Sequence, residues 1–159
     1  SLDEGTPRFF RRFPATKYDQ PQLQAEADAL AEFSAAAAKL YDLDPRTIIP
    51  LGYSNGANIA LTSLVRHPNA YAGAILIRPV MPMEDPPMVD LHGLPVLVLH
   101  GARDPSLPLG EGVSSYLQHN SANVTEHRLN AGHELTDEDR HLMIAWLTTN
   151  HNTASGHMV

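Results

Sequence analysis

The stretch Thr47-Ile48-Ile49-Pro50-Leu51-Gly52-Tyr53-Ser54-Asn55-Gly56 decides the fold of this chain. Its apolar first half predicts a strand over residues 47–52, and a helical pattern follows over about 55–66. A serine flanked by two glycines, G-x-S-x-G, therefore lies where a strand turns sharply into a helix. Glycines avoid the clashes that a Cβ atom would cause where the two elements approach. Such a turn holds the serine Oγ out beyond the sheet edge, as a nucleophile requires.

The composition is that of one globular domain. The chain has 159 residues, of which 43% are hydrophobic and 18% charged, enough for a single core. A formal net charge of -7, with no long basic stripe, argues against nucleic acid and against an anionic membrane surface. The absence of cysteine excludes disulfides, thiolate metal sites and cysteine nucleophiles. No apolar run is long enough to span a bilayer, and residues 1–5 lack signal-peptide features, which favours a cytoplasmic protein.

Strands and helices alternate along the chain. This alternation predicts a mainly parallel sheet with helices on both faces, and ligands bind beyond the carboxyl ends of such strands. We expect residues 1–148 to form one domain and residues 149–159 to form a polar tail, where Gly156-His157-Met158 resembles a cloning remnant. The expected strands are 47–52, 73–77, 95–100 and 123–129, and the expected helices are 20–42, 55–66, about 110–119 and 136–148.

Two further polar residues follow strand ends. A serine hydroxyl needs a base to take its proton, and the base needs a carboxylate to orient it. Asp104 comes just after the third strand, in His100-Gly101-Ala102-Arg103-Asp104-Pro105, and His133 follows the fourth, in Ala131-Gly132-His133-Glu134. The carboxyl ends of parallel strands meet at one edge of the sheet, so the three side chains should converge. We interpret Ser54 as the nucleophile, His133 as the base and Asp104 as the orienting acid.

Other residues compete for two of these roles. Asp85 and Asp90 also carry carboxylates, but both lie in a proline-rich loop over residues 79–93 rather than at a strand end. Among the nine histidines, His92 precedes the strand that it would have to follow. No histidine pair has metal-site spacing on a predicted helix, so no metal site is expected.

The chain at this point resembles the phospholipase/carboxylesterase family of α/β hydrolases. The resemblance runs over about residues 5–148 and predicts an α/β-hydrolase fold. The motifs that carry it are Gly52 to Ala60, His100 to Pro105 with Pro108, Gly132 to Thr136, and Pro7-Arg8-Phe9-Phe10-Arg11-Arg12, which is similar to small bacterial carboxylesterases.

The resemblance implies serine carboxylesterase activity on a small-molecule ester, without a cofactor. It carries Ser54, Asp104 and His133 over as the catalytic triad. Acyl thioesters and lysophospholipids are the substrates of family variants, so an acyl-thioesterase or a lysophospholipase is the alternative within the family. Flexible thioethers adapt to varied apolar ligands. The expected acyl pocket is lined by Met81, Met83, Met88 and Leu107, although core packing explains the methionines equally well.

Acyl transfer also needs an oxyanion hole. One donor should be the backbone N–H of Asn55, directly after the nucleophile. The second comes, in the resembled family, from a loop after an earlier strand, and the sequence predicts no strand before residue 47. We therefore expect the C-terminal four strands of the fold. Three explanations are open: a separate N-terminal segment or chain completes the fold, the sequence is a fragment, or the protein is circularly permuted. An inactive partial-fold subunit that needs such a partner is the alternative outside enzymes.

Overall fold

The structure, a computed structural model, describes residues 2–3, 6–7, 12–13, 17–44 and 47–154. The helices are α1 Gln20–Leu40, α2 Asn55–Arg66, α3 Leu107–Gly110, α4 Gly112–His119 and α5 Asp137–Ala154. The main sheet contains β5 Leu51–Tyr53, β6 Ala74–Ile77, β7 Pro95–Gly101 and β8 Asn123–Leu129. Two short hairpins precede it, β1 Leu2–Asp3 with β2 Thr6–Pro7, and β3 Arg12–Phe13 with β4 Lys17–Tyr18.

The main sheet is parallel, and its strands follow the order β5-β6-β7-β8. Gly52 lies opposite Leu76, and Ile77 lies opposite Leu99. Sequential parallel strands alternating with helices are what the sequence pattern predicts, so the expected fold class is confirmed, although the connection from β6 to β7 contains no helix. Because all four strands run the same way, the residues that follow them gather at one edge.

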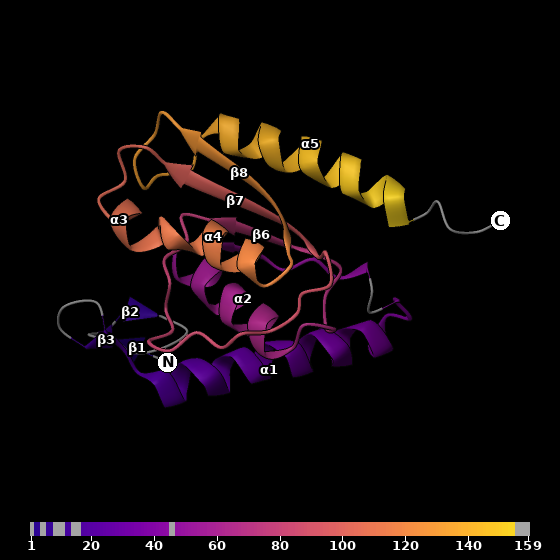
Figure 1. Ribbon diagram of the computed structural model, residues 1–159. Coiled ribbons are helices and arrows are strands. Elements are labelled where there is room, and N and C mark those ends of the chain that lie inside the picture. Colours follow the sequence, from indigo (N-terminus) through magenta and orange to yellow (C-terminus); the bar gives the residue numbers. More distant parts are fainter. Residues whose placement is uncertain (1, 4–5, 8–11, 14–16, 45–46, 155–159) are drawn as a thin grey trace.

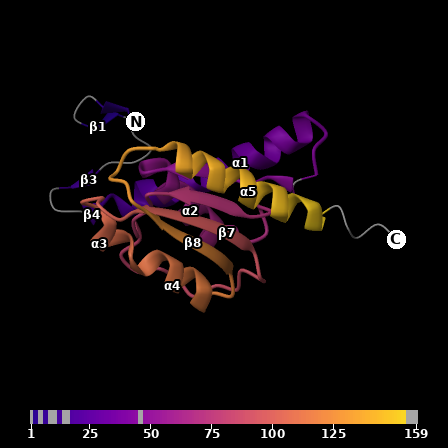
Figure 2. The ribbon, with the colours of Figure 1, turned by 90° about the horizontal axis from the view of Figure 1, so that it is seen from above.

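Helices cover both faces of this sheet (Figure 1). Alternate strand residues point to opposite faces, so each strand supplies two cores. One core joins the sheet to α2 and α4 and includes Leu61, Leu64, Leu76, Val98 and Leu117. The other lies under α5 and includes Ile75, Ile77, Leu97, Leu99 and Trp146. Figure 2 shows α5 lying over the strands when the molecule is seen from above.

Helix α1 forms an outer layer against α2 rather than against the sheet (Figure 1). Its Leu23 and Ala27 pack with Ile59 of α2. Asp19 caps its first turn by accepting a hydrogen bond from the Gln22 backbone N–H at 3.1 Å. The expected helix over 20–42 is thereby confirmed, with its end two residues earlier at Leu40.

Larger differences from the expected bounds occur at three further places. The first strand begins at Leu51 rather than 47, because Pro50 has no N–H to donate to a ladder. The helix expected near 110–119 corresponds to α4, which begins at Gly112, and the short helix α3 precedes it. The last helix continues to Ala154, six residues beyond its expected end at 148.

Two expectations concern regions with little or no description. Arg8 and Arg11 of the basic motif lie outside the described residues, as do Gly156 to Met158.

Among the helices that are described, none is both long enough and apolar enough to cross a membrane.

The contact between β5 and α2 depends on Gly52. A Cβ atom at this position would lie 2.2 Å from the Gly56 carbonyl oxygen, which is backbone and cannot rotate away. Gly52→Ala should therefore lower the free energy of unfolding by about 1–3 kcal/mol, measured by urea denaturation. Gly112→Ala is the matched control, since no heavy atom lies within 4 Å of its added methyl group. Equal stabilities of the two variants would contradict this account of the turn.

Candidate active site

Ser54 occupies a strained position between β5 and α2. Its φ of 53° and ψ of -116° lie where non-glycine residues are rare. Two backbone hydrogen bonds hold it there, from Ser54 N–H to Ile77 O at 2.8 Å and from Asn58 N–H to Ser54 O at 3.1 Å. The turn is thus fixed by the neighbouring strand and by the helix that it opens.

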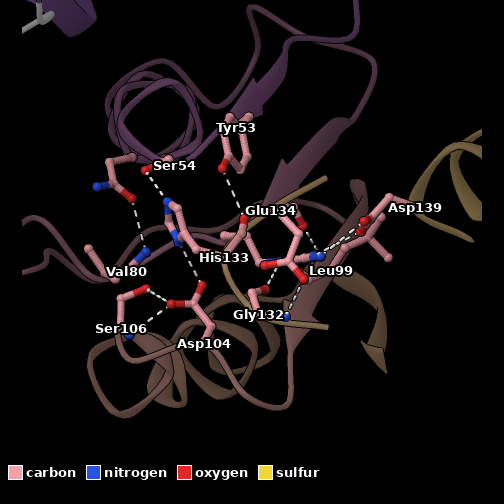
Figure 3. Close-up of polar contacts among 12 residues, drawn as sticks. Tyr53, Ser54, Val80, Leu99, Asp104, Ser106, Gly132, His133, Glu134 and Asp139 are labelled. Carbon is pink, nitrogen blue, oxygen red and sulfur yellow. Dashed lines mark hydrogen bonds and ion pairs between the residues drawn. The ribbon is translucent and has the colours of Figure 1, made fainter. Parts of the chain in front are cut away.

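The structure brings Ser54, His133 and Asp104 together (Figure 3). The Ser54 Oγ lies 2.9 Å from His133 Nε2, and His133 Nδ1 lies 2.8 Å from Asp104 Oδ2. Each residue follows a different strand, respectively β5, β8 and β7. Convergence of three strand ends therefore produces a continuous chain of hydrogen bonds from hydroxyl to carboxylate.

Asp104 is the buried end of this chain, with a side chain only 3% exposed. Its second oxygen accepts hydrogen bonds from the Ser106 N–H at 2.8 Å and the Ser106 hydroxyl at 2.7 Å. Burial raises the pKa of Asp104, but the hydrogen bonds from Ser106 and the contact with His133 outweigh it and lower the pKa below its usual value. The carboxylate is therefore ionised at neutral pH.

The ionised carboxylate fixes the proton positions on His133. A carboxylate only accepts, so His133 Nδ1 must carry the hydrogen that it shares with Asp104. In the neutral ring, Nε2 is then free to accept the Ser54 hydroxyl proton. Asp90, one of the alternatives to Asp104, instead accepts from the His92 N–H at 2.8 Å, and both Asp85 and Asp90 are exposed.

Sequence reasoning missed Arg78 as a residue of this region. It directly follows β6, its side chain is fully buried, and it forms a bidentate pair with Asp139 of α5 at 2.8 and 2.9 Å. Its φ of 52° directs the chain sharply away from the strand. A charged residue immediately after the apolar run Ala74 to Ile77 was the available signal. Burial of such a charge requires a partner, which the sequence does not identify.

The expected oxyanion and pocket residues lie on three elements. Asn55 is the first residue of α2, where helical N–H groups have no partner within the helix. Met81 and Met83 are partly buried against the core, Met88 is 75% exposed, and Leu107 begins α3 after Asp104. Their roles stay predictions. Within the described ranges, no three histidine or acidic side chains gather as a metal site would require.

Comparisons with known proteins show similarity over most of this chain. Residues 14–151 match the model of the phospholipase/carboxylesterase family. The Bacillus subtilis protein named "Putative hydrolase MhqD" is 32% identical over 147 residues, which are 91% of this chain and 74% of that protein.

Two crystal structures of carboxylesterases are also similar. The Bacillus cereus carboxylesterase superposes with a TM-score of 0.88 and 37% identity, over 94% of this chain and 72% of its own. The Mesorhizobium loti carboxylesterase gives a TM-score of 0.86 and 32% identity, over 91% of this chain and 70% of its own.

The buried Arg78–Asp139 pair should make stability depend on pH. Burial raises the pKa of Asp139, but the hydrogen bonds from Arg78 and Thr136 outweigh it and lower the pKa below the usual 3.8. Because the folded-state pKa is the lower one, the contribution is complete above pH 3.8 and is lost as pH falls through the folded value. Asp139→Asn should cost about 3–5 kcal/mol at neutral pH, measured by urea unfolding.

The same series at lower pH tests the sign. The difference between wild type and Asp139→Asn should be constant near neutrality and shrink below pH 3.8. Asp137→Asn is the control, because that side chain is 90% exposed on the first turn of α5. A difference that grows on acidification would contradict the assignment.

Proposed function

This chain belongs to the phospholipase/carboxylesterase family of α/β hydrolases, and we propose that it hydrolyses carboxylic esters through an acyl-enzyme on Ser54. The enzyme class, a serine hydrolase of the carboxylesterase type, follows from the family and its relatives. The observation that carries the mechanism is the hydrogen-bond chain from Ser54 through His133 to Asp104. That chain supplies a nucleophile, a base and an orienting acid in the required order.

Acylation starts with attack of the Ser54 Oγ on the ester carbonyl carbon. The hydroxyl proton passes to His133 Nε2, 2.9 Å away, as the new carbon–oxygen bond forms. Asp104 stabilises the resulting imidazolium through Nδ1. The tetrahedral intermediate then collapses, the carbon–oxygen bond to the alcohol breaks, and His133 returns the proton to the leaving oxygen.

Deacylation repeats the sequence with water. His133 Nε2 takes a proton from water, whose oxygen attacks the acyl carbon of the Ser54 ester. Collapse breaks the bond to Ser54 Oγ, and His133 returns the proton to the serine. The carboxylic acid leaves and the enzyme is restored.

The negative charge on the carbonyl oxygen needs hydrogen-bond donors in both steps. We assign one donor to the backbone N–H of Asn55, at the N-terminus of the 12-residue helix α2. Loss of one such donor costs roughly a hundred- to a thousandfold in turnover. The acyl site determines the substrate class within the family, which is an oxygen ester, an acyl thioester or a lysophospholipid. Activity measured on a panel of these substrates distinguishes the three.

Covalent labelling tests the nucleophile. A fluorophosphonate should form one adduct on the peptide that contains Ser54, because the activated hydroxyl that attacks an ester carbonyl also attacks the phosphorus atom of the label. Peptide mapping by mass spectrometry measures the site. Ser54→Ala should lose both the label and hydrolysis of p-nitrophenyl esters.

The control is Ser115→Ala, which removes an exposed serine hydroxyl from α4. It should retain the label and the activity. Folded protein that hydrolyses esters while Ser54 stays unlabelled would sink the proposal.

A second candidate, a subunit that acts only with a partner segment, is favoured by the outer edge of β5. This strand ends the sheet in the described part of the chain, and Leu51 on it is 57% exposed. An open edge presents unpaired backbone groups to another strand. Under this candidate, the 159-residue chain alone, verified by intact mass, should fold but leave Ser54 unlabelled. Labelling without any companion chain would exclude it.

A further inference from the structure

The backbone of the His133 loop is held by side chains from two neighbouring strand ends. Three consecutive carbonyl groups, those of Gly132, His133 and Glu134, each accept a hydrogen bond from such a side chain. Arg78 Nε donates to Gly132 O at 3.0 Å, and Arg78 Nη2 donates to Glu134 O at 3.0 Å. The Tyr53 hydroxyl donates to His133 O at 2.9 Å. We refer to these three contacts as the carbonyl clamp; Figure 3 labels Tyr53 and the three residues whose carbonyls accept.

We propose that Arg78 and Tyr53 are positioning residues that act through this clamp to hold the His133 imidazole between Ser54 and Asp104. The inference rests on the proposed esterase function and deepens it. It concerns how the base is aligned, not which groups react.

Arg78 is suited to this role because every one of its donors has a partner. Besides the two loop carbonyls, its guanidinium donates to the Leu99 carbonyl at 3.3 Å and to both Asp139 oxygens. A guanidinium has five N–H donors in a rigid planar fork, and five hydrogen bonds use all of them. Asp139 is in turn held by the Thr136 N–H and hydroxyl, at 2.9 and 2.8 Å. The clamp therefore has little freedom to move.

Tyr53 adds a second contact to the same loop. Its ring lies 5.3 Å from the His133 ring, tilted by 41°, while its hydroxyl reaches the His133 carbonyl. The one side chain thus constrains both the backbone and the ring of His133. Tyr53 also directly precedes Ser54 at the end of the short strand β5. The positions of the nucleophile and of the base therefore both depend on this strand.

The loop needs such restraint. His133 is 42% exposed, and the segment between β8 and α5 is neither helix nor strand. A displacement of about 1 Å at a reacting group can cost about a hundredfold in rate. The loop is further closed by Glu134, whose carboxylate accepts from the Gly132 N–H at 3.0 Å, and by Gly101, where a Cβ would lie 2.0 Å from Gly132 O.

The test compares two chemically matched pairs of variants. Tyr53→Phe removes only the clamp hydroxyl, and its control Tyr116→Phe removes a hydroxyl that donates to the Pro87 carbonyl at 2.6 Å. Arg78→Lys removes the fork, and its control Arg66→Lys removes a fork that pairs with Asp28 at 2.8 Å on the α1–α2 surface. Each control makes the same change away from His133.

Kinetics provide the first readout. Tyr53→Phe and Arg78→Lys should lower kcat for p-nitrophenyl acetate by about ten- to a hundredfold without a change in KM, in protein shown to be folded by circular dichroism. The controls should keep kcat. If Arg78→Lys does not fold, Tyr53→Phe decides the question.

A spectroscopic readout separates this inference from the proposed function. The downfield proton resonance of His133 Nδ1–H, assigned by its loss in His133→Gln, reports the alignment with Asp104 whether or not the protein hydrolyses esters. It should broaden or vanish in Tyr53→Phe and persist in Tyr116→Phe. Persistence of the resonance in Tyr53→Phe, or a kcat of this variant equal to that of its control, would contradict the positioning role of the carbonyl clamp. Wild type with this resonance but without esterase activity would instead overturn the proposed function.

Discussion

The close approach of β5 and α2 is the constraint on which the rest of the site depends. Gly52 lets the two backbones meet at a distance that a Cβ atom at this position would not allow. Ser54 is consequently forced to a positive φ, where its hydroxyl projects from the turn instead of packing against the sheet. Hydrogen bonds from this short turn to β6 and within α2 sustain the strain. Only residues that follow strands at the same edge of the sheet can reach a nucleophile fixed in this way.

The sequence allowed much of this site to be predicted because its signals are local. A glycine pair around a serine, and an aspartate and a histidine a few residues after predicted strands, place Ser54, Asp104 and His133 at strand ends. Parallel strands then make their convergence a matter of geometry. The catalytic roles remain a proposal, whereas the α/β-hydrolase fold and the family are established.

The supporting contacts could not be predicted because they are long-range. The Arg78 guanidinium meets a carboxylate 61 residues later, and the Tyr53 hydroxyl meets a carbonyl 80 residues later. Neither pair of residues has a characteristic spacing in the sequence, because each contact depends on how α5 and the loop before it pack in the folded protein. The predicted bounds of strands and helices were wrong for local reasons. Examples are the missing N–H of Pro50 before β5 and the polar residues in the last turns of α5.

The central claim, a covalent acyl-enzyme on Ser54, is tested most directly by rapid quenching during turnover. Wild-type protein mixed with p-nitrophenyl acetate and quenched in acid should carry the mass of one acetyl group. Digestion should place that group on the peptide containing Ser54, and it should disappear once the ester is consumed. Ester turnover with no adduct, or with an adduct on any other peptide, would contradict the account.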